Sequence, residues 1–382
     1  MNCEDAGWLH AWAPTYMGSV GWIRADLVGD VEPTLRDTLE KLRATSPQDH
    51  SLVKQLADRV MALGPLDEGA HEAAIRALEA SGDPDGAARA RQRLTALRVP
   101  EVRQAPGEPQ LIFVAEGELI SPLAVLDHGK LTSYPVPDAI DPETTANTVR
   151  SFSERYFATG RAYRLYANGL AEGLALVKRE EEPSCASVVA SFTRVSKGAP
   201  MLAGGILTNF DLAPKTASPT PKLTEPQRRQ VIDLVRSDLR SRSVNEDHIQ
   251  RILATAEAGK PGLVINVGPS EGRSFPVLIA TAAFESYPKQ VEPDGSYIGY
   301  ELRMIAEADP TGRYRLTHRE FNQTDSEQNF SPRKFVTYLD IDKDGNDELI
   351  FSGSGYEWWW YEALGRSEGG WKVLVRGGGG GC

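Results

Sequence analysis

Phe335-Val-Thr-Tyr-Leu-Asp340-Ile-Asp342-Lys-Asp344-Gly-Asn346-Asp-Glu348-Leu-Ile-Phe351 carries the clearest structural signal in this sequence. Both of its ends are rich in β-branched and aromatic residues, which is typical of strands. Between these ends, carboxylates occupy positions 1, 3, 5 and 9 of a loop, and a glycine occupies position 6. Alternate residues of a tight loop point inward together, and a glycine permits the sharp turn. The stretch therefore predicts two strands joined by an acidic loop.

The acidic loop predicts a calcium site. Clustered carboxylates repel one another unless a hard cation lies between them, and Ca²⁺ takes about 6–8 oxygen ligands. An EF-hand is excluded because position 12 is Phe351 instead of Glu and because strands flank the loop. A D-x-D-x-D-G-x-x-[DE] loop between strands resembles the calcium loop of FG-GAP and VCBS repeat proteins. The resemblance implies five ligands: Asp340, Asp342, Asp344, the backbone carbonyl of Asn346, and Glu348.

Two acidic residues of the loop, Glu348 and Asp347, differ from the usual family pattern. Glu348 stands where the repeat family more usually has Asp, and it keeps the ligand oxygen. Asp347 is not a ligand in that pattern, and we expect it to be a spare carboxylate that faces solvent. The alternative to the calcium site is an acidic, solvated turn that binds no metal.

A second copy of this unit lies upstream. An offset of 72 residues (340 − 268) places Leu263–Val267 on Phe335–Leu339, and Val277–Ile279 on Leu349–Phe351, with apolar residues on apolar residues. The ligand positions of the upstream copy are Gly268, Ser270, Gly272 and Pro276, so we do not expect that copy to bind the ion. A lone hairpin is marginally stable in water, so such units stack. We predict a two-copy β-repeat domain over residues 262–382, with one calcium loop.

The upstream copy also contains a possible catalytic motif. Gly268-Pro-Ser270-Glu-Gly272 fits the G-x-S-x-G nucleophile elbow of hydrolases. That elbow is followed by a helix, which Pro276 and its β-branched neighbours disfavour. His318 is the one histidine downstream that could serve as a base. We expect a protein that is not an enzyme, and keep a hydrolase with Ser270 as nucleophile as an alternative.

The composition is that of an ordinary globular protein with two or three domains: 382 residues, 41% apolar and 25% charged. The net charge of −11 disfavours nucleic acid as a partner, because phosphate binding needs clustered Lys and Arg. The sequence contains no run of about 18 apolar residues, so we expect no membrane span, and we expect no signal peptide because no basic-then-apolar segment occurs near Met1. Cys185 and Cys382 would pair only in an exported protein, and free thiols are the alternative.

The N-terminal part combines a strand-like segment with helices. Within residues 1–30, the segment Gly18–Val28 resembles the closing strands of a bacterial SH3-like module. Only about half of that module is present. We therefore expect that the chain starts late or that other strands complete the module. In residues 34–99, Arg59–Leu63 recurs as Arg93–Leu97, an offset of 34 (97 − 63) that equals the tetratricopeptide period. The tetratricopeptide resemblance implies a face that contacts a protein or peptide; the alternative is a plain helical hairpin.

The middle of the chain is predicted from local signals. Residues 108–212 are β-rich, with a hairpin that turns at Asn168-Gly169 and whose loop we extend to Glu172. Residues 224–258 form a helical connector whose first helix is capped by Thr224. Tyr356–Tyr361 places aromatic side chains on both faces of a strand. The row is either buried on both faces or exposed on one, and exposed aromatic rows bind sugars or peptides.

These observations predict an α+β protein in which tetratricopeptide-like helical hairpins precede a β-rich domain of stacked antiparallel hairpins. We expect a non-catalytic, exported-type bacterial protein with one structural Ca²⁺ that mediates protein–protein or surface interaction. The cytosol offers little free Ca²⁺, so the site favours the periplasm or the cell exterior. A cytosolic tetratricopeptide scaffold without bound metal is the alternative.

Overall fold

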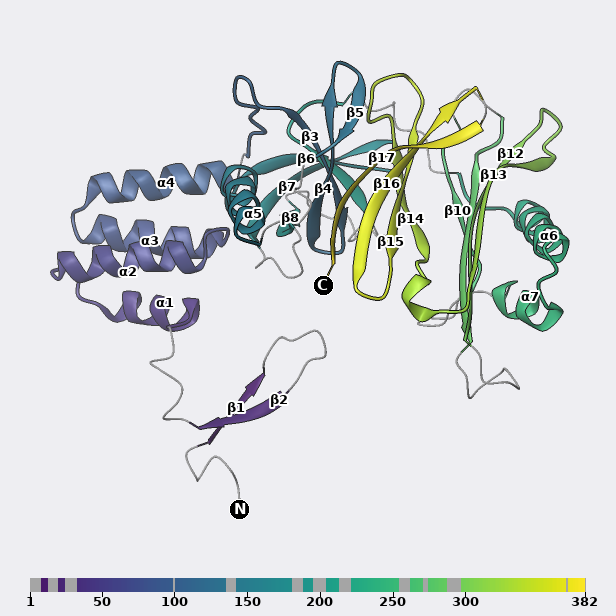
Figure 1. The fold of residues 1–382 in the computed structure, drawn as a ribbon. Coiled ribbons are helices and arrows are strands. Elements are labelled where there is room, and N and C mark those ends of the chain that lie inside the picture. Colours follow the sequence, from purple (N-terminus) through teal and green to yellow (C-terminus); the bar gives the residue numbers. More distant parts are fainter. Residues whose placement is uncertain are drawn as a thin grey trace. The chain divides into compact units, whose positions relative to one another are not determined.

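The predicted fold class is confirmed: N-terminal helices precede antiparallel β-sheets with interspersed helices (Figure 1). The chain forms two compact units, Met1–Val99 and Pro100–Cys382, in this computed structural model. The structure describes residues 8–12, 20–24, 33–98, 100–134, 142–180, 188–194, 204–212, 221–253, 262–270, 274–286, 297–368 and 370–381.

The described residues of the first unit form one small hairpin and four helices. Strands β1 (Trp8–Trp12) and β2 (Val20–Arg24) pair antiparallel, with Trp12 opposite Val20. These two strands are the described part of the SH3-like segment; the rest of residues 1–30 lies outside the described residues. The helices are α1 (Leu35–Ala44), α2 (His50–Leu63), α3 (Glu68–Ala80) and α4 (Pro84–Arg98).

Capping and small side chains explain the four helices. Thr34, Asp49 and Asp67 each accept a hydrogen bond from a backbone N–H in the first turn of the following helix, which satisfies donors that have no partner inside the helix. The helices approach closely because alanines fill their contacts. Five of these alanines are fully buried: Ala57, Ala70, Ala74, Ala87 and Ala90.

The second unit begins with a closed sheet, here sheet I. Its strands run in the order β3-β9-β6-β7-β8-β4-β5, and β3 also pairs with β4, so the sheet closes on itself. Helix α5 (Pro142–Tyr156) packs on its core, where the rings of Phe152 and Phe113 lie 6.4 Å apart. The strands are β3 (Gln110–Glu116), β4 (Leu119–Asp127), β5 (Lys130–Ser133), β6 (Ala162–Ala167), β7 (Leu170–Glu180), β8 (Ala190–Arg194) and β9 (Gly205–Thr208).

Two four-stranded sheets follow, each with its antiparallel strands in chain order. The upstream segment of the sequence alignment falls on the first of them and the calcium-loop segment on the second. Sheet II consists of β10 (Val264–Val267), β11 (Leu278–Ser286), β12 (Ile298–Ala308) and β13 (Tyr314–Thr324). Sheet III consists of β14 (Arg333–Leu339), β15 (Glu348–Ser354), β16 (Trp358–Ser367) and β17 (Gly370–Gly381).

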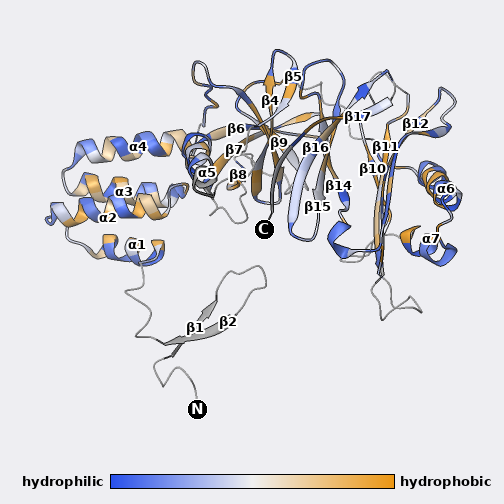
Figure 2. Ribbon diagram, viewed as in Figure 1, coloured by the Kyte–Doolittle hydropathy of each residue, from blue (hydrophilic) through white to orange (hydrophobic). Residues whose placement is uncertain are grey.

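Sheet III is the central layer of the second unit. One of its faces packs on sheet I through residues such as Ile350 and Ala363, and the other packs on sheet II, where Phe351 joins a cluster with Ile279 and Ile305. The far face of sheet II is covered by α6 (Glu225–Ser241) and α7 (Glu246–Leu253). The hydropathy colouring shows helices, such as α2 and α3, that carry both polar and apolar residues (Figure 2). The helices of the predicted connector thus form an outer layer.

No helix within the described ranges is both long enough and apolar enough to cross a membrane, as the sequence predicts.

Candidate metal centre

The acidic loop connects the ends of two neighbouring strands of sheet III. Asp340 directly follows the last residue of β14, and Glu348 is the first residue of β15. Leu339 pairs with Glu348 across the two strands, which holds the two ends of the loop together. The sheet therefore places the first and last of the predicted ligands side by side.

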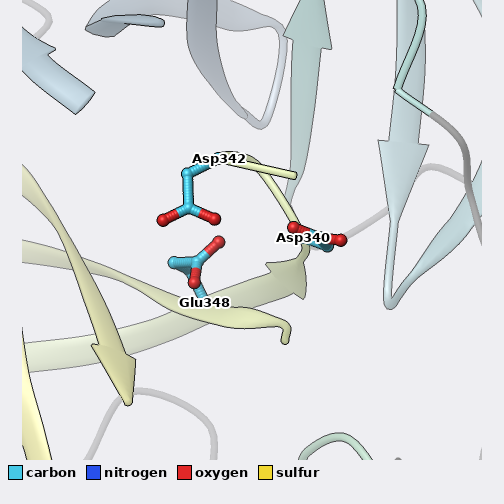
Figure 3. A group of neighbouring side chains, drawn as sticks. All are labelled: Asp340, Asp342 and Glu348. Carbon is cyan, nitrogen blue, oxygen red and sulfur yellow. The ribbon is translucent and has the colours of Figure 1, made fainter. Parts of the chain in front are cut away.

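Three carboxylates converge in this loop. Asp340, Asp342 and Glu348 each offer one oxygen, and these oxygens all lie within 4.8 Å of one another (Figure 3). The carboxylates of Asp342 and Glu348 are turned toward one another, with that of Asp340 beside them. Because Ca²⁺–oxygen distances are about 2.3–2.6 Å, two ligands of one ion lie at most about 5 Å apart. The separations fit three ligands of a single ion.

Backbone hydrogen bonds within the loop orient these carboxylates. Gly345 takes a left-handed conformation with φ +93°, which a glycine adopts without strain. Its N–H donates to Asp340 Oδ2 at 3.1 Å, while the N–H of Asp344 donates to Asp342 Oδ1 at 3.0 Å and that of Ile341 to Glu348 Oε2 at 2.9 Å. Each oxygen of a carboxylate accepts more than one bond. These hydrogen bonds therefore orient the carboxylates and leave lone pairs available for a cation.

Glu348 has the most strongly perturbed electrostatics of the group. Its side chain is 1% exposed, and burial raises its pKa to about 9, with the negative charges of Asp342, Asp344 and Asp340 contributing in the same direction. Burial likewise raises the pKa of Asp342. A buried carboxyl must be protonated or neutralised by a cation. The described charges that act on Glu348 are carboxylates, so a bound divalent cation would supply the missing positive charge.

Two further carboxylates of the loop, those of Asp344 and Asp347, lie apart from these three. Asp344 is exposed, and its Oδ1 accepts bonds from the backbone N–H of Asn346 at 2.7 Å and from the Asn346 side chain at 3.2 Å. Asp344 therefore lies outside the converging group of three. The prediction for Asp347 is wrong: its side chain is 3% exposed instead of facing solvent. Burial raises the pKa of Tyr338 to about 12, and the negative charge of Asp347 contributes in the same direction.

The residues of the alternative catalytic motif lie elsewhere in the second unit. Ser270 is half-buried in the connection between β10 and β11, and the next described element is the strand β11, not a helix. His318 lies on β13, where its Nε2 is 3.4 Å from Glu320 Oε1. Residues 271 and 272, which complete the motif, lie outside the described part of the chain, as do Cys185 and Cys382 of the possible disulfide.

A buried ionic cluster between sheets II and III was not predicted from the sequence. Arg303 of β12 is 1% exposed; it donates to Glu362 of β16, which is fully buried, and to Glu320 of β13 at 2.7 Å. Its guanidinium also lies 4.5 Å from the ring centre of Phe351. The available signal was the alternation of Glu301 and Arg303 in a mostly apolar strand.

No protein-family model matches this sequence, and no significant match is found among curated proteins or solved structures. The fold and the site define an α+β protein with a candidate divalent-cation loop.

Proposed function

We propose that this chain is a non-catalytic, exported-type multidomain protein whose β-rich unit is braced by one structural Ca²⁺ and whose helices bind a protein or peptide. The observation that carries the proposal is the buried carboxyl of Glu348 within 4.8 Å of the oxygens of Asp340 and Asp342. Hard carboxylate oxygens are the ligands that Ca²⁺ prefers. Asp344 and the carbonyl of Asn346 would complete the set that the loop pattern implies.

Bound Ca²⁺ would stabilise sheet III. The loop joins β14 to β15, and sheet III lies between sheets I and II. An ion that binds the folded loop but not the unfolded chain contributes its binding free energy to folding. The ion would also remove the mutual repulsion of the three carboxylates. We assign the ion a structural role, because the loop connects two strands of the central sheet.

The helical unit supports the binding part of the proposal. Helices α2 and α4 begin 34 residues apart (84 − 50), the period of the tetratricopeptide resemblance. A pocket of about 250 Å³ lies among α1, α2 and α3, with Leu42 and Ala77 in its wall and Arg43 and Arg76 beside them. Apolar walls next to arginines suit a peptide with an apolar and an acidic side chain.

An external compartment follows from the proposed ion. Free Ca²⁺ is scarce in the cytosol, and a structural site of modest affinity fills only where Ca²⁺ is plentiful. Fractionation of cells that express the full-length gene product would test this part. Recovery in the periplasm or medium is expected, whereas recovery in the cytosol would favour the scaffold without metal.

A thermal melt tests the ion. At a Ca²⁺ concentration of about 100 times Kd, binding adds about 2.7 kcal/mol to the stability of the folded state, which is roughly 5–10 °C in Tm for a unit of this size. We expect that rise for the wild-type chain in Ca²⁺ relative to chelator, and none for Asp342→Ala. Asp325→Ala, an exposed aspartate outside the loop, should retain the rise. An unchanged wild-type Tm would refute the site.

A further inference from the structure

A cavity of about 930 Å³ borders the acidic loop. Its walls come from three segments of the second unit: the chain that precedes β3, the hairpin that joins β4 to β5, and the acidic loop itself, which contributes Asp342 and Lys343. Pockets for small ligands measure about 300–1,000 Å³. The cavity is therefore large enough for such a ligand, and one of the proposed calcium ligands lies in its wall.

The acidic loop leaves part of the coordination shell of the proposed ion open. Asp340, Asp342 and Glu348 each offer one oxygen to a common point, and the loop pattern implies two more oxygens, from Asp344 and the carbonyl of Asn346. Ca²⁺ takes about 6–8 oxygen ligands. With five oxygens from the loop, about one to three positions are left for oxygens from outside it.

The burial of the ligands indicates the side from which the ion is reached. Glu348 is 1% exposed, so it closes the inner side of the site. Asp342 is only half-buried and lies in the wall of the cavity, and its carboxylate is turned toward that of Glu348 (Figure 3). An ion held between these two carboxylates would therefore have its open positions on the side of Asp342, which is the side of the cavity.

Lys343 adds a positive charge to the same wall. It is exposed, and its Nζ lies 4.9 Å from the centre of the Phe210 ring. Within the described part of the chain, its ammonium forms no ion pair with a carboxylate. Lys343 is therefore available to pair with an anion that enters the cavity.

The other charged side chains of the cavity wall already have partners. Glu108, whose side chain is 2% exposed, binds Arg161, and Asp127 Oδ1 lies 2.6 Å from His128 Nδ1. The remaining polar side chains of the wall are neutral amides and hydroxyls: Gln104, Gln110, Thr132 and Ser133. The proposed ion and the ammonium of Lys343 are thus the charged groups that a ligand would meet, and both attract an anion.

We propose that this cavity binds a ligand with a free carboxylate, one oxygen of which completes the coordination of the ion while the other pairs with Lys343. The proposal rests on the calcium site proposed above and gives the ion a second role, in ligand binding. A carboxylate suits both contacts, because Ca²⁺ prefers hard oxygens and an ammonium forms its stronger hydrogen bonds with charged acceptors. An acidic side chain of a peptide and a uronic acid residue both carry this group.

Terbium luminescence tests this proposal separately from the calcium site itself. Tb³⁺ substitutes for Ca²⁺ at oxygen sites, and its luminescence lifetimes in H₂O and D₂O report how many water molecules it binds. With the full chain in excess over Tb³⁺, we expect the ion to bind with water in its shell. Triglutamate, trigalacturonate or both should then displace about one water, with Kd below about 1 mM. Triglutamine amide, which is neutral, should displace none.

The outcomes separate the two proposals. Absence of Tb³⁺ binding would refute the calcium site and the ligand site with it. If Tb³⁺ binds but keeps all of its water in about 10 mM of either acid, or loses as much water to triglutamine amide, only the ligand proposal is overturned. The two acids show whether the carboxylate is recognised on a peptide, on a sugar or on both.

Two variants test the cavity. Lys343→Gln should weaken binding of the acid about fivefold, as for loss of an exposed ion pair, and Thr132→Trp should prevent binding by filling the cavity from an exposed position. Both variants keep the three converging carboxylates, so both should still bind Tb³⁺. Lys372→Gln is the matched control, because Lys372 is exposed and does not line the cavity. The proposal fails if both cavity variants bind the acid like the wild type, or if the control is weakened as much as Lys343→Gln.

Discussion

At the scale of single residues, Gly377 makes the clearest prediction. A Cβ at this position would overlap the carbonyl oxygen of Leu123, so the backbone of β17 lies directly against that of β4. The contact is fixed nearby by Ser133, whose hydroxyl donates to the carbonyl of Arg376 at 2.7 Å. Gly377→Ala should lower the free energy of unfolding by about 1–3 kcal/mol, the usual effect of overpacking, as measured by urea denaturation.

Lys372→Ala is the control for that variant. Lys372 lies on the same strand, and its side chain is exposed, so its removal should change stability by no more than about 0.5 kcal/mol. If Gly377→Ala were as stable as this control, the close approach of β17 and β4 would be wrong.

Local sequence patterns predict the acidic loop better than they predict burial. The alternation of acidic residues around Gly345 selected Asp340, Asp342 and Glu348, whose oxygens converge, because it depends on neighbours in the chain, but it also selected Asp344, which is exposed and lies outside that group. The burial of Asp347 could not be predicted, since it depends on Tyr338 and the packing around it. The close approach of Gly377 to another strand could not be predicted either, because the residue that it contacts, Leu123, is more than two hundred residues away in sequence.

At the scale of secondary-structure elements, turns were predictable but strand ends were not. Asn168 and Gly169 both take positive φ, 49° and 75°, as a two-residue hairpin turn requires. The predicted loop up to Glu172 is wrong, because β7 begins at Leu170 directly after this turn. The aromatic row of β16 was left open between core and exposed face. Trp358 and Trp360 stack on the same face of β16 and are 45% and 8% exposed, so the exposure changes along the strand, which the sequence of the aromatic row does not determine.

Arg303 and Glu362 connect two elements, β12 of sheet II and β16 of sheet III, and both are buried. Without Arg303, Glu362 keeps the hydrogen bond from Arg376 Nε at 3.0 Å and lies 3.6 Å from Arg333 Nε, so the cost stays below that of a fully uncompensated buried charge. We therefore expect Arg303→Met to destabilise the chain by about 1.5–3 kcal/mol in urea denaturation, the usual contribution of hydrogen bonds to a charged group. The double variant with Glu362→Gln should lose clearly less than the two single variants combined, with a coupling above about 1 kcal/mol.

The exposed pair Arg240–Glu246, with bonds of 2.8 and 3.0 Å, provides a matched control. Ion pairs at the surface contribute little because solvent screens them, so the corresponding cycle with Arg240→Met and Glu246→Gln should show a much smaller coupling than the buried pair. Equal coupling in both cycles would mean that the buried pair does not join the two sheets.

At the scale of the whole molecule, the two compact units have separate hydrophobic cores. The core of the first unit is built from α1 to α4, and the cores of the second from the three sheets with α5, α6 and α7. The order of helices before sheets was predictable from sequence periodicity alone. The stacking of sheet III between sheets I and II was not, because all three present similar apolar faces and nothing local specifies which pair meets.

Separate cores predict two calorimetric transitions. Thr34 caps α1 in the first unit and Thr224 caps α6 in the second, each in a capping box. Loss of such a cap costs about 1 kcal/mol, so Thr34→Ala should lower one Tm by roughly 4–8 °C, and Thr224→Ala should lower the other. Ca²⁺ should raise the transition that Thr224→Ala lowers, since the acidic loop lies in that unit. A single transition that both variants shift alike would show that the chain unfolds as one body.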